Sequence, residues 1–182
     1  MKRFAVLLFS ALVACTLATV GILSDPSTAE AAGNRVKKCG GGKISLNADE
    51  KKAFALHNAE RRDRNLRPLC VSPKLQKVAR AHSKDMIRRD YFSHTTKGTK
   101  RDGCDRVENS GYRFRACGEN IAWGSGAKGS PESIMRSWMK SSGHRSNILS
   151  RKYREVGIGT YTGTFNGYRN VTMYTADFAT RR

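Results

Sequence analysis

Cysteine pairing limits the possible folds of this chain more than any other feature of its sequence, because each disulfide holds two separate segments together. Of the five cysteines, Cys15 lies in an apolar N-terminal run. The other four are Cys39, Cys70, Cys104 and Cys117. An even number of cysteines in an exported chain predicts two disulfides. The absence of any Cys-x-x-Cys spacing disfavours a metal thiolate cluster.

Three pairings of these cysteines are possible, and the sequence alone does not choose among them. We favour Cys104–Cys117, because its short separation closes a loop easily, and Cys39–Cys70 follows by elimination. A loop of the shorter length stabilises a fold by about 3 kcal/mol in the chain-entropy model.

The first 31 residues are interpreted as an export signal and not as part of the fold. Lys2 and Arg3 precede an apolar run over residues 4–23, and Ala29-Glu30-Ala31 gives a small-x-small cleavage pattern. Two alternatives stay open. Leu12-Val13-Ala14-Cys15 resembles a lipobox, which would leave Cys15 lipidated, and the apolar run is long enough for an uncleaved helical anchor.

The strong positive charge predicts which partners the protein meets. The 182 residues leave room for one domain, and the formal net charge is +19 at pH 7. We therefore expect anionic polymers or lipids of the cell envelope as partners. Nucleic acid is not expected, because Lys and Arg are scattered without a nucleic-acid-binding motif. Membrane contact is expected only peripherally or through the N-terminal anchor, and the protein is expected to be a monomer.

Helix signals follow a basic, glycine-rich arm over residues 32–46. Asn47 and Glu50 form a capping box at the start of a helix predicted to reach about Arg64. Ser72-Pro73 is predicted to cap and open a second helix ending near Asp90. The apolar stripe of this helix includes His82, which we interpret as a core histidine.

The second half of the chain mixes helices with strands. A short helix is predicted over residues 105–110, a short strand near 112–114, and a helix from Ser130 to Gly143, with His144 in the turn after it. Phe165-Asn166-Gly167 marks a hairpin between two final strands. Because helices come first and paired strands last, the order indicates an α+β fold with helices against an antiparallel sheet.

One short segment with an acidic residue is the best candidate for a functional site. Gly118-Glu119-Asn120 places a carboxylate between a glycine and an asparagine, residue types typical of tight, loop-like backbone. His94 and His144 lie on predicted loop-like segments on either side. One carboxylate and two imidazoles suit a metal site or an acid–base site.

Several motifs occur together in a fixed order. They are His57-Asn58-x-x-Arg61, Pro68-Leu69, Ala81-His82-Ser83-x-Asp85-Met86, Tyr91-Phe92-Ser93-His94, Gly118-Glu119-Asn120-Ile121-Ala122, Trp138-Met139-x-Ser141-x-Gly143-His144-Arg145-x-Asn147-Ile148-Leu149 and Gly157-x-Gly159. Together they resemble the bacterial branch of the CAP superfamily (cysteine-rich secretory proteins, antigen 5 and pathogenesis-related proteins). The resemblance runs from about Leu46 to Phe178. It implies that residues 47–182 form a three-layer α-β-α sandwich with a central cleft.

The resemblance also implies a site. In that family two histidines and two glutamates line the cleft, and metal ions bind the histidines. His94 and Glu119 match one pair, while Ser141 replaces the second glutamate and the segment 174–178 has no histidine. His144 is the nearest substitute. The predicted ligands of Zn²⁺ or another divalent cation are therefore His94, His144 and Glu119, and the predicted cleft-lining residues are Asn120, Ser141 and Arg145.

The family is known mostly for binding roles outside the cell. We therefore expect a secreted binding module of the cell envelope for a lipid, glycan or protein ligand. The alternative is a metal-assisted hydrolase, in which zinc would lower the pKa of a bound water to about 7. The chain contains neither a His-Glu-x-x-His motif nor a Gly-x-Ser-x-Gly nucleophile elbow.

Overall fold

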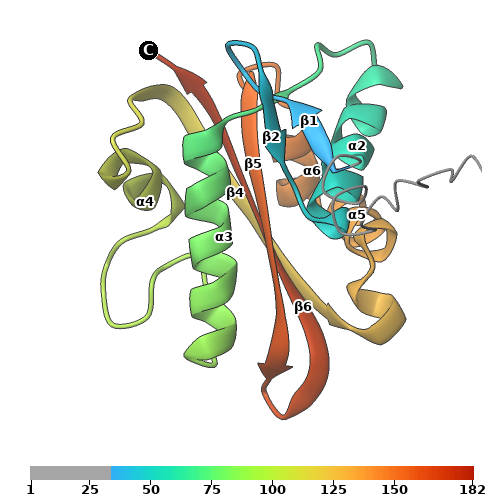
Figure 1. The fold of residues 1–182 in the computed structure, drawn as a ribbon, viewed down its shortest axis with the longest axis vertical. Helices are drawn as coiled ribbons and strands as arrows, with labels where there is room; N and C mark the ends of the chain where they lie inside the picture. The colour runs from blue at the N-terminus through green and yellow to red at the C-terminus, as the bar shows by residue number, and fades with distance from the viewer. Residues whose placement is uncertain (1–33) are drawn as a thin grey trace, which may run out of the picture.

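A four-stranded sheet forms the centre of the computed structural model, which describes residues 34–182. The predicted signal and its two alternatives lie outside the described residues. The strands of the sheet are β3 (Cys70–Val71), β4 (Phe114–Ser125), β5 (Glu155–Phe165) and β6 (Tyr168–Arg181). The strand order is β3-β5-β6-β4, so the long strand β4 forms one edge (Figure 1).

The sheet is mixed, not purely antiparallel as predicted. β6 runs antiparallel to both β4 and β5, whereas β3 is parallel to β5 over two residues. Cys70 lies in β3 and is bonded to Cys39, so a disulfide holds this short strand at the far edge. The parallel pair is thus a small addition to an antiparallel sheet.

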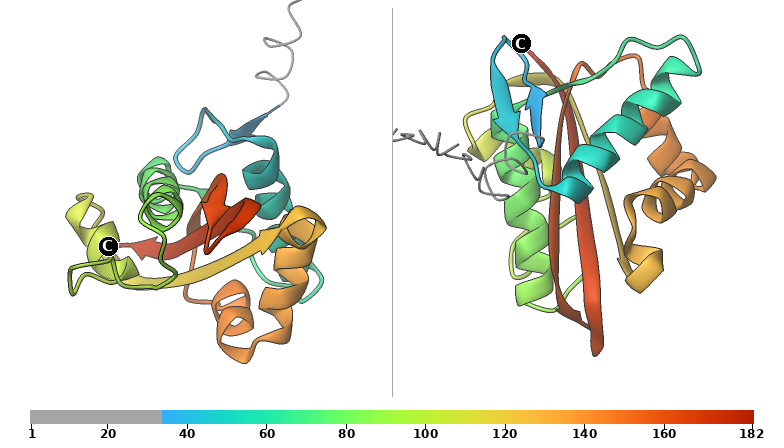
Figure 2. Two further views of the ribbon diagram at one scale, coloured as in Figure 1. Left: turned by 90° about the horizontal axis from the view of Figure 1, so that it is seen from below. Right: turned by 45° about the vertical axis from the view of Figure 1, so that its right-hand side comes forward.

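Helices cover both faces of the sheet, which confirms the α-β-α sandwich. The helices are α2 (Ala48–Arg62), α3 (Pro73–Arg88), α4 (Gly103–Asn109), α5 (Pro131–Lys140) and α6 (Ser142–Leu149), with a 3-10 turn η1 (Gly126–Gly129). α3 lies on one side of the strands and α5 and α6 lie on the other (Figure 2). A hydrophobic core lies on each face of the sheet, and successive side chains of β6 point alternately into the two cores. Phe178 packs with α2, α5 and α6 on one face, and Met173 packs with α3 on the other.

Two glycines let α3 lie directly on β5. A Cβ at Gly157 would come within 2.1 Å of the carbonyl carbon of Leu75, and one at Gly159 within 2.1 Å of the amide nitrogen of Arg80. Any side chain at either position would push the helix away from the sheet. The alternation of these glycines with apolar residues is thus a packing requirement.

Most predicted helix and hairpin boundaries are confirmed. Asn47 and Glu50 form the capping box of α2, and α4 and α5 begin close to the predicted residues. The Asn166-Gly167 turn joins β5 to β6, with φ of 47° and 77°. Both values are positive, as the type I′ hairpin turn requires.

Three local predictions were wrong. Ser72 precedes α3 but makes no side-chain cap, because its buried hydroxyl has no hydrogen-bond partner within residues 34–182. The segment Gly118–Asn120 lies inside β4, since it pairs with β6 along its length. His144 lies in α6 and not in a turn. The described part of the arm is a hairpin of β1 (Arg35–Lys37) and β2 (Lys43–Ser45), which turns at three consecutive glycines with positive φ.

Both predicted disulfides are confirmed. Cys39 pairs with Cys70 and Cys104 pairs with Cys117, with Cα–Cα distances of 5.2 Å and 5.9 Å. The second bond joins α4 to β4, next to the acidic segment. Over residues 34–182, none of the helices has the length and apolar character needed to cross a membrane.

Candidate functional site at the free edge of the sheet

The edge strand β4 sends its two key side chains to opposite faces of the sheet, because successive residues of a strand alternate. Glu119 points toward α4 and the loop that carries His94. Asn120 points toward α6, where its side-chain amide donates to the backbone oxygen of His144 at 3.0 Å. The site is therefore built around the edge of the sheet from both faces.

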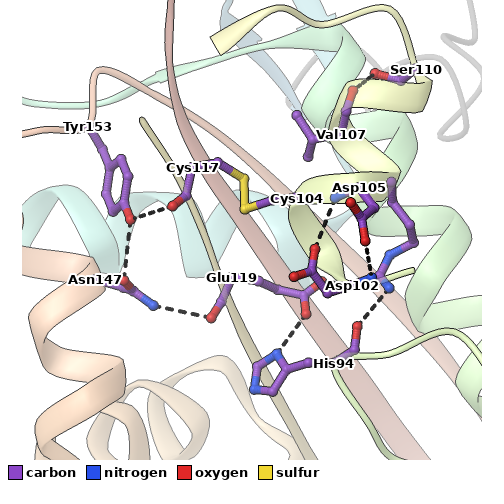
Figure 3. Close-up of a disulfide and its surroundings, with 11 residues drawn as sticks. His94, Asp102, Cys104, Asp105, Val107, Ser110, Cys117, Glu119, Asn147 and Tyr153 are labelled. Atoms are coloured by element: carbon purple, nitrogen blue, oxygen red, sulfur yellow. Dashed lines mark hydrogen bonds and ion pairs between the residues drawn. A yellow bond between two sulfur atoms is a disulfide. The ribbon is translucent and has the colours of Figure 1, made fainter. Parts of the chain in front are cut away.

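Glu119 uses both carboxylate oxygens within the protein, and Figure 3 shows its contact with His94. Its Oε1 lies 2.7 Å from Nδ1 of His94, and its Oε2 accepts from Nη2 of Arg106. The Glu119 side chain is only 5% exposed, whereas that of His94 is 53% exposed. Glu119 thus lies behind His94 and fixes the orientation of an imidazole that faces solvent.

Arg106 of α4 also holds the loop that contains His94. Its Nη1 donates to the backbone oxygen of His94 at 2.7 Å and to the hydroxyl of Thr96 at 3.2 Å. One guanidinium therefore neutralises Glu119 and positions the backbone of its imidazole partner. Nothing in the sequence singles out Arg106 from the other basic residues, because its role depends on how α4 packs against β4.

A second buried carboxyl lies beside Glu119. Asp177 of β6 is 1% exposed and is the cross-strand neighbour of both Glu119 and Gly157. Neither of its carboxyl oxygens has a hydrogen-bond partner within residues 34–182. Burial, and then the negative charge of Glu119, raise the pKa of Asp177 well above its usual value.

The pKa of Glu119 moves in the opposite direction. Burial alone would raise it, but the hydrogen bond from His94 and the positive charge of Arg106 lower the pKa of Glu119 below its usual value. The two neighbouring carboxyls are therefore shifted in opposite directions, so that Glu119 favours its ionised form and Asp177 favours its protonated form.

Replacing Asp177 with asparagine should stabilise the protein increasingly as pH rises. A folded-state pKa above the unfolded value adds stability at low pH, and this stability is lost as pH rises through the folded-state value. The amide has nearly the same shape and no such proton to lose. Urea denaturation of both proteins from about pH 4, near the ordinary pKa of an aspartate, up to about pH 9 measures the difference. If the unfolding free energies of the two proteins changed with pH in the same way, the pKa of Asp177 would not be raised in the fold.

The Cys104–Cys117 disulfide and Gly103 bring α4 close to Glu119. Cys117 lies two residues before Glu119 in β4, and the disulfide lies beside the His94–Glu119 pair (Figure 3). A Cβ at Gly103 would lie 2.8 Å from the carboxyl carbon of Glu119. The first residue of α4 must therefore be small for Arg106 to reach the carboxylate.

Side chains from the other face bind the outer backbone of β4. Asn147 of α6 donates to the backbone oxygen of Glu119 at 3.2 Å, and the hydroxyl of Tyr153 donates to that of Cys117 at 3.0 Å (Figure 3). The indole of Trp138 donates to the backbone oxygen of Ile121 at 3.2 Å. Trp138 and Asn147 thus fix α5 and α6 against the strand that carries Glu119, and Tyr153 fixes the segment that follows α6.

An open pocket lies between the two histidines. Its volume is about 560 Å³, within the range of small-molecule sites. Its lining combines aromatic rings, small apolar groups, hydroxyls and imidazoles: Phe92, Ser93, His94, Ile121, Ala122, Trp123, Ser137, Trp138, Ser141 and His144. We call it the edge pocket. Burial, and then the nearby charge of His94, lower the pKa of His144, so this imidazole favours its neutral form.

The predicted site residues take different places around this pocket. His94, His144 and Ser141 line it. Glu119 lies behind His94, and Asn120 is fully buried beneath His144. Arg145 does not line the pocket, and its guanidinium donates to the backbone oxygen of Met139 at 3.1 Å. His82 is buried and bonds to the backbone oxygen of Ser93, as expected of a core histidine.

The donor atoms left for a metal are few. Both oxygens of Glu119 are already paired, and within residues 34–182 no three His, Cys, Asp or Glu side chains form a metal-binding group. The remaining donors are the outer nitrogen of His94 and the imidazole of His144, whose buried Nδ1 lacks a partner within the same residues. Catalytic zinc sites use three protein ligands. The arrangement therefore does not fit the three-residue zinc site.

The family comparison covers most of the chain. The model described as "Cysteine-rich secretory protein family" (CAP) matches residues 54–178. Two proteins of Bacillus subtilis (strain 168) are similar in sequence. The chain is 40% identical over 115 residues to "Uncharacterized protein YkwD", covering 63% of this chain and 43% of that protein. It is 34% identical over 122 residues to "Uncharacterized membrane protein YlbC", covering 64% of this chain and 34% of that protein. The chain thus matches less than half the length of each.

Solved structures show the same architecture. An extracellular protein containing an SCP domain from Bacillus anthracis is 30% identical, with a TM-score of 0.61, covering 74% of this chain and 40% of that one. An outer surface protein from Borrelia burgdorferi is 21% identical, with a TM-score of 0.63, and the match covers 78% of this chain and 98% of that one. At that identity the second likeness concerns the fold alone.

Proposed function

This chain belongs to the cysteine-rich secretory protein family, CAP, and from that premise we propose that it is an extracellular binding module of the cell envelope. Its ligand site is the edge pocket. The observation that supports this proposal most directly is the lining of the edge pocket. Aromatic rings, hydroxyls and two imidazoles surround about 560 Å³ of open space. Such a mixture suits a small ligand with an apolar face and several hydroxyl or carbonyl groups, as sugars and lipid headgroups have.

The polar and apolar sides of the pocket would act on different parts of the ligand. Phe92 is 43% exposed, although it borders a pocket, and it offers a ring for stacking. His94 is held by Glu119 and His144 favours its neutral form, so the two imidazoles offer hydrogen bonds at fixed positions. The ligand is thus expected to lie with its apolar face on Phe92 and its polar groups near the histidines.

Export supports the placement outside the cell. Two disulfides are typical of chains that mature in an oxidising compartment, and the N-terminal pattern predicts a signal. The similar Bacillus anthracis protein is described as extracellular. The net charge of +19 would favour retention on anionic envelope polymers or lipids.

Binding is favoured over metal-assisted hydrolysis for a geometric reason. A hydrolase of the predicted type needs Glu119 as a base or as a third zinc ligand. His94 and Arg106 each occupy one of its oxygens, and its side chain is only 5% exposed and does not line the edge pocket. Glu119 is therefore assigned the role of positioning His94.

The tryptophans make this proposal easy to test. The chain has two tryptophans, Trp123 and Trp138, and both line the edge pocket, so intrinsic fluorescence reports on that pocket. Titration with cell-wall glycan fragments and with soluble lipids should change the emission for one class and saturate. Phe92→Ala should weaken that binding about tenfold, the order of one lost stacking contact.

The control is Tyr168→Ala, which removes a more exposed aromatic ring that does not line the pocket. Because this ring lies 6.1 Å from that of Trp123, the affinities of the variants are compared and not their emission intensities. The affinity of the control should stay within about twofold of the wild type, because the lost ring makes no ligand contact. An equal loss in both variants, or an unchanged emission with every glycan and lipid tried, would overturn the proposal.

A further inference from the structure

A second, smaller cavity lies where the loop after α2 meets the loop before β5. Its volume is about 120 Å³, well below the range of small-molecule pockets, so it suits a single chemical group. It is lined by Arg61, Asn65, Leu66, Arg67, Arg151 and Arg154. We call it the arginine cavity. Four of its six lining residues carry a guanidinium, and none is acidic.

These four charges lack protein counter-ions. None of the four arginines forms an ion pair with a carboxylate within the described part of the chain. Arg67 and Arg151 are exposed, whereas Arg61 is only 1% exposed. Like charges gathered around one cavity repel each other, and an anion placed among them would relieve that repulsion.

Arg61 shows that the cavity is a formed site and not a random surface cluster. Its Nε donates to the backbone oxygen of Arg67 at 2.9 Å. Its Nη1 donates to the backbone oxygens of Ile148 and Ser150 at 2.8 Å and 2.9 Å. These bonds fix the guanidinium plane, while the two N–H groups of Nη2 make no hydrogen bond within residues 34–182.

Electrostatics support the same conclusion. Burial, and then the charge of Arg154, lower the pKa of Arg61, which means that its positive charge is disfavoured where it lies. Arg154 is itself held in place, because its Nη1 donates to the backbone oxygens of Arg151 and Tyr153 at 2.6 Å and 3.0 Å. A bound anion would stabilise both guanidinium groups.

We propose that the arginine cavity binds a phosphate group. Guanidinium groups match carboxylate and phosphate oxygens through paired N–H donors. A carboxylate has two oxygens in one plane and a single charge, so it cannot engage donors arriving from two separate loops as fully. A phosphate presents three or more oxygens in a tetrahedral arrangement and can carry close to two charges. Asn65 adds a side-chain amide at the rim.

This site is separate from the edge pocket and does not depend on the function proposed for it. His144 lies near the start of α6, whereas Arg61 binds the backbone at its end, so the helix separates the two sites. The phosphate could be free, part of a phosphodiester polymer, or the headgroup of a lipid. All three share the chemistry that the cavity recognises.

Calorimetry with inorganic phosphate, at an ionic strength held constant with sodium chloride, tests the proposal. The protein should bind one phosphate per chain. The double variant Arg67→Gln/Arg151→Gln should bind it at least about tenfold more weakly, as expected when charge-assisted contacts are lost. The control Arg113→Gln/Arg115→Gln removes two exposed charges that make no side-chain hydrogen bond or ion pair elsewhere in the described residues, and should change affinity less than about twofold.

Two results would overturn the proposal: no heat of binding with the wild-type protein, or equal weakening in the two double variants. A glycerol phosphate polymer and phosphatidylglycerol vesicles then serve as competitors for the bound phosphate. Displacement by the polymer alone assigns a phosphodiester chain, and displacement by the vesicles alone assigns a lipid headgroup. Displacement by neither assigns free phosphate.

Discussion

Replacing Arg106 with alanine should lower the free energy of unfolding by about 3–5 kcal/mol at neutral pH, the usual cost of breaking a buried ion pair. The side chains of Arg106 and Glu119 are 13% and 5% exposed. Without Arg106, Glu119 would stay buried beside Asp177 with only His94 as a partner, and the backbone of the His94 loop would lose its donor. Urea denaturation followed by circular dichroism measures the loss.

Arg101→Ala is the matched control, because Arg101 is exposed in the same loop and its guanidinium makes no hydrogen bond within residues 34–182. It should change the unfolding free energy by less than about 0.5 kcal/mol. The cost of Arg106→Ala should shrink as pH falls, because the pKa of Glu119 is lowered in the fold and protonation of Glu119 removes the unpaired charge. A cost below about 1 kcal/mol at neutral pH would mean that water already reaches Glu119.

Removing the Cys104–Cys117 disulfide should cost about 3 kcal/mol of unfolding free energy, given the sequence separation of 13 residues. The double variant Cys104→Ser/Cys117→Ser should also bind edge-pocket ligands more weakly than its unfolded fraction explains. The reason is that the disulfide joins α4, which carries Arg106, to the strand that carries Glu119. Denaturation and tryptophan fluorescence titration measure the two effects.

The second disulfide provides the comparison for this result. Cys39→Ser/Cys70→Ser opens a longer loop, of separation 31, and should cost at least as much stability in the chain-entropy model. It lies by β3 at the far edge of the sheet, so it should leave ligand affinity at the edge pocket unchanged after correction for unfolding. Equal losses of affinity in the two double variants would contradict a specific role for Cys104–Cys117.

The elements predicted correctly are those whose signals are local. The capping box at Asn47, the apolar stripe of α3 and the Asn166-Gly167 turn each depend on a few neighbouring residues. The centre of β4 has no such signal. Its Gly118-Glu119-Asn120 sequence is typical of a loop, and it forms a strand because β6 pairs with it and Arg106 neutralises its charge.

The candidate site was predicted in part for the same reason. His94 and Glu119 were expected at one cleft, and they are in contact. Arg106, Asp177 and Asn147 were not expected there, because each reaches the site through tertiary packing and not through a nearby motif. The sequence does contain one signal for Asp177, which is an acidic residue among the apolar and small residues of a predicted strand. His144 was placed in a turn because Gly143 precedes it, but a Cβ at Gly143 meets no atom within 4 Å, and α6 begins before it.

The side chains that bind the outer backbone of β4 also bear on the solubility of this protein. A free sheet edge is a template on which another chain can add a strand, and long exposed edges promote aggregation. Along β4 the backbone oxygens of Cys117, Glu119 and Ile121 point away from β6, and each already accepts a side-chain donor. An incoming strand would have to displace all three donors and the helices that carry two of them. This part of the edge is therefore protected against β-augmentation, although the edge pocket beside it is open to solvent.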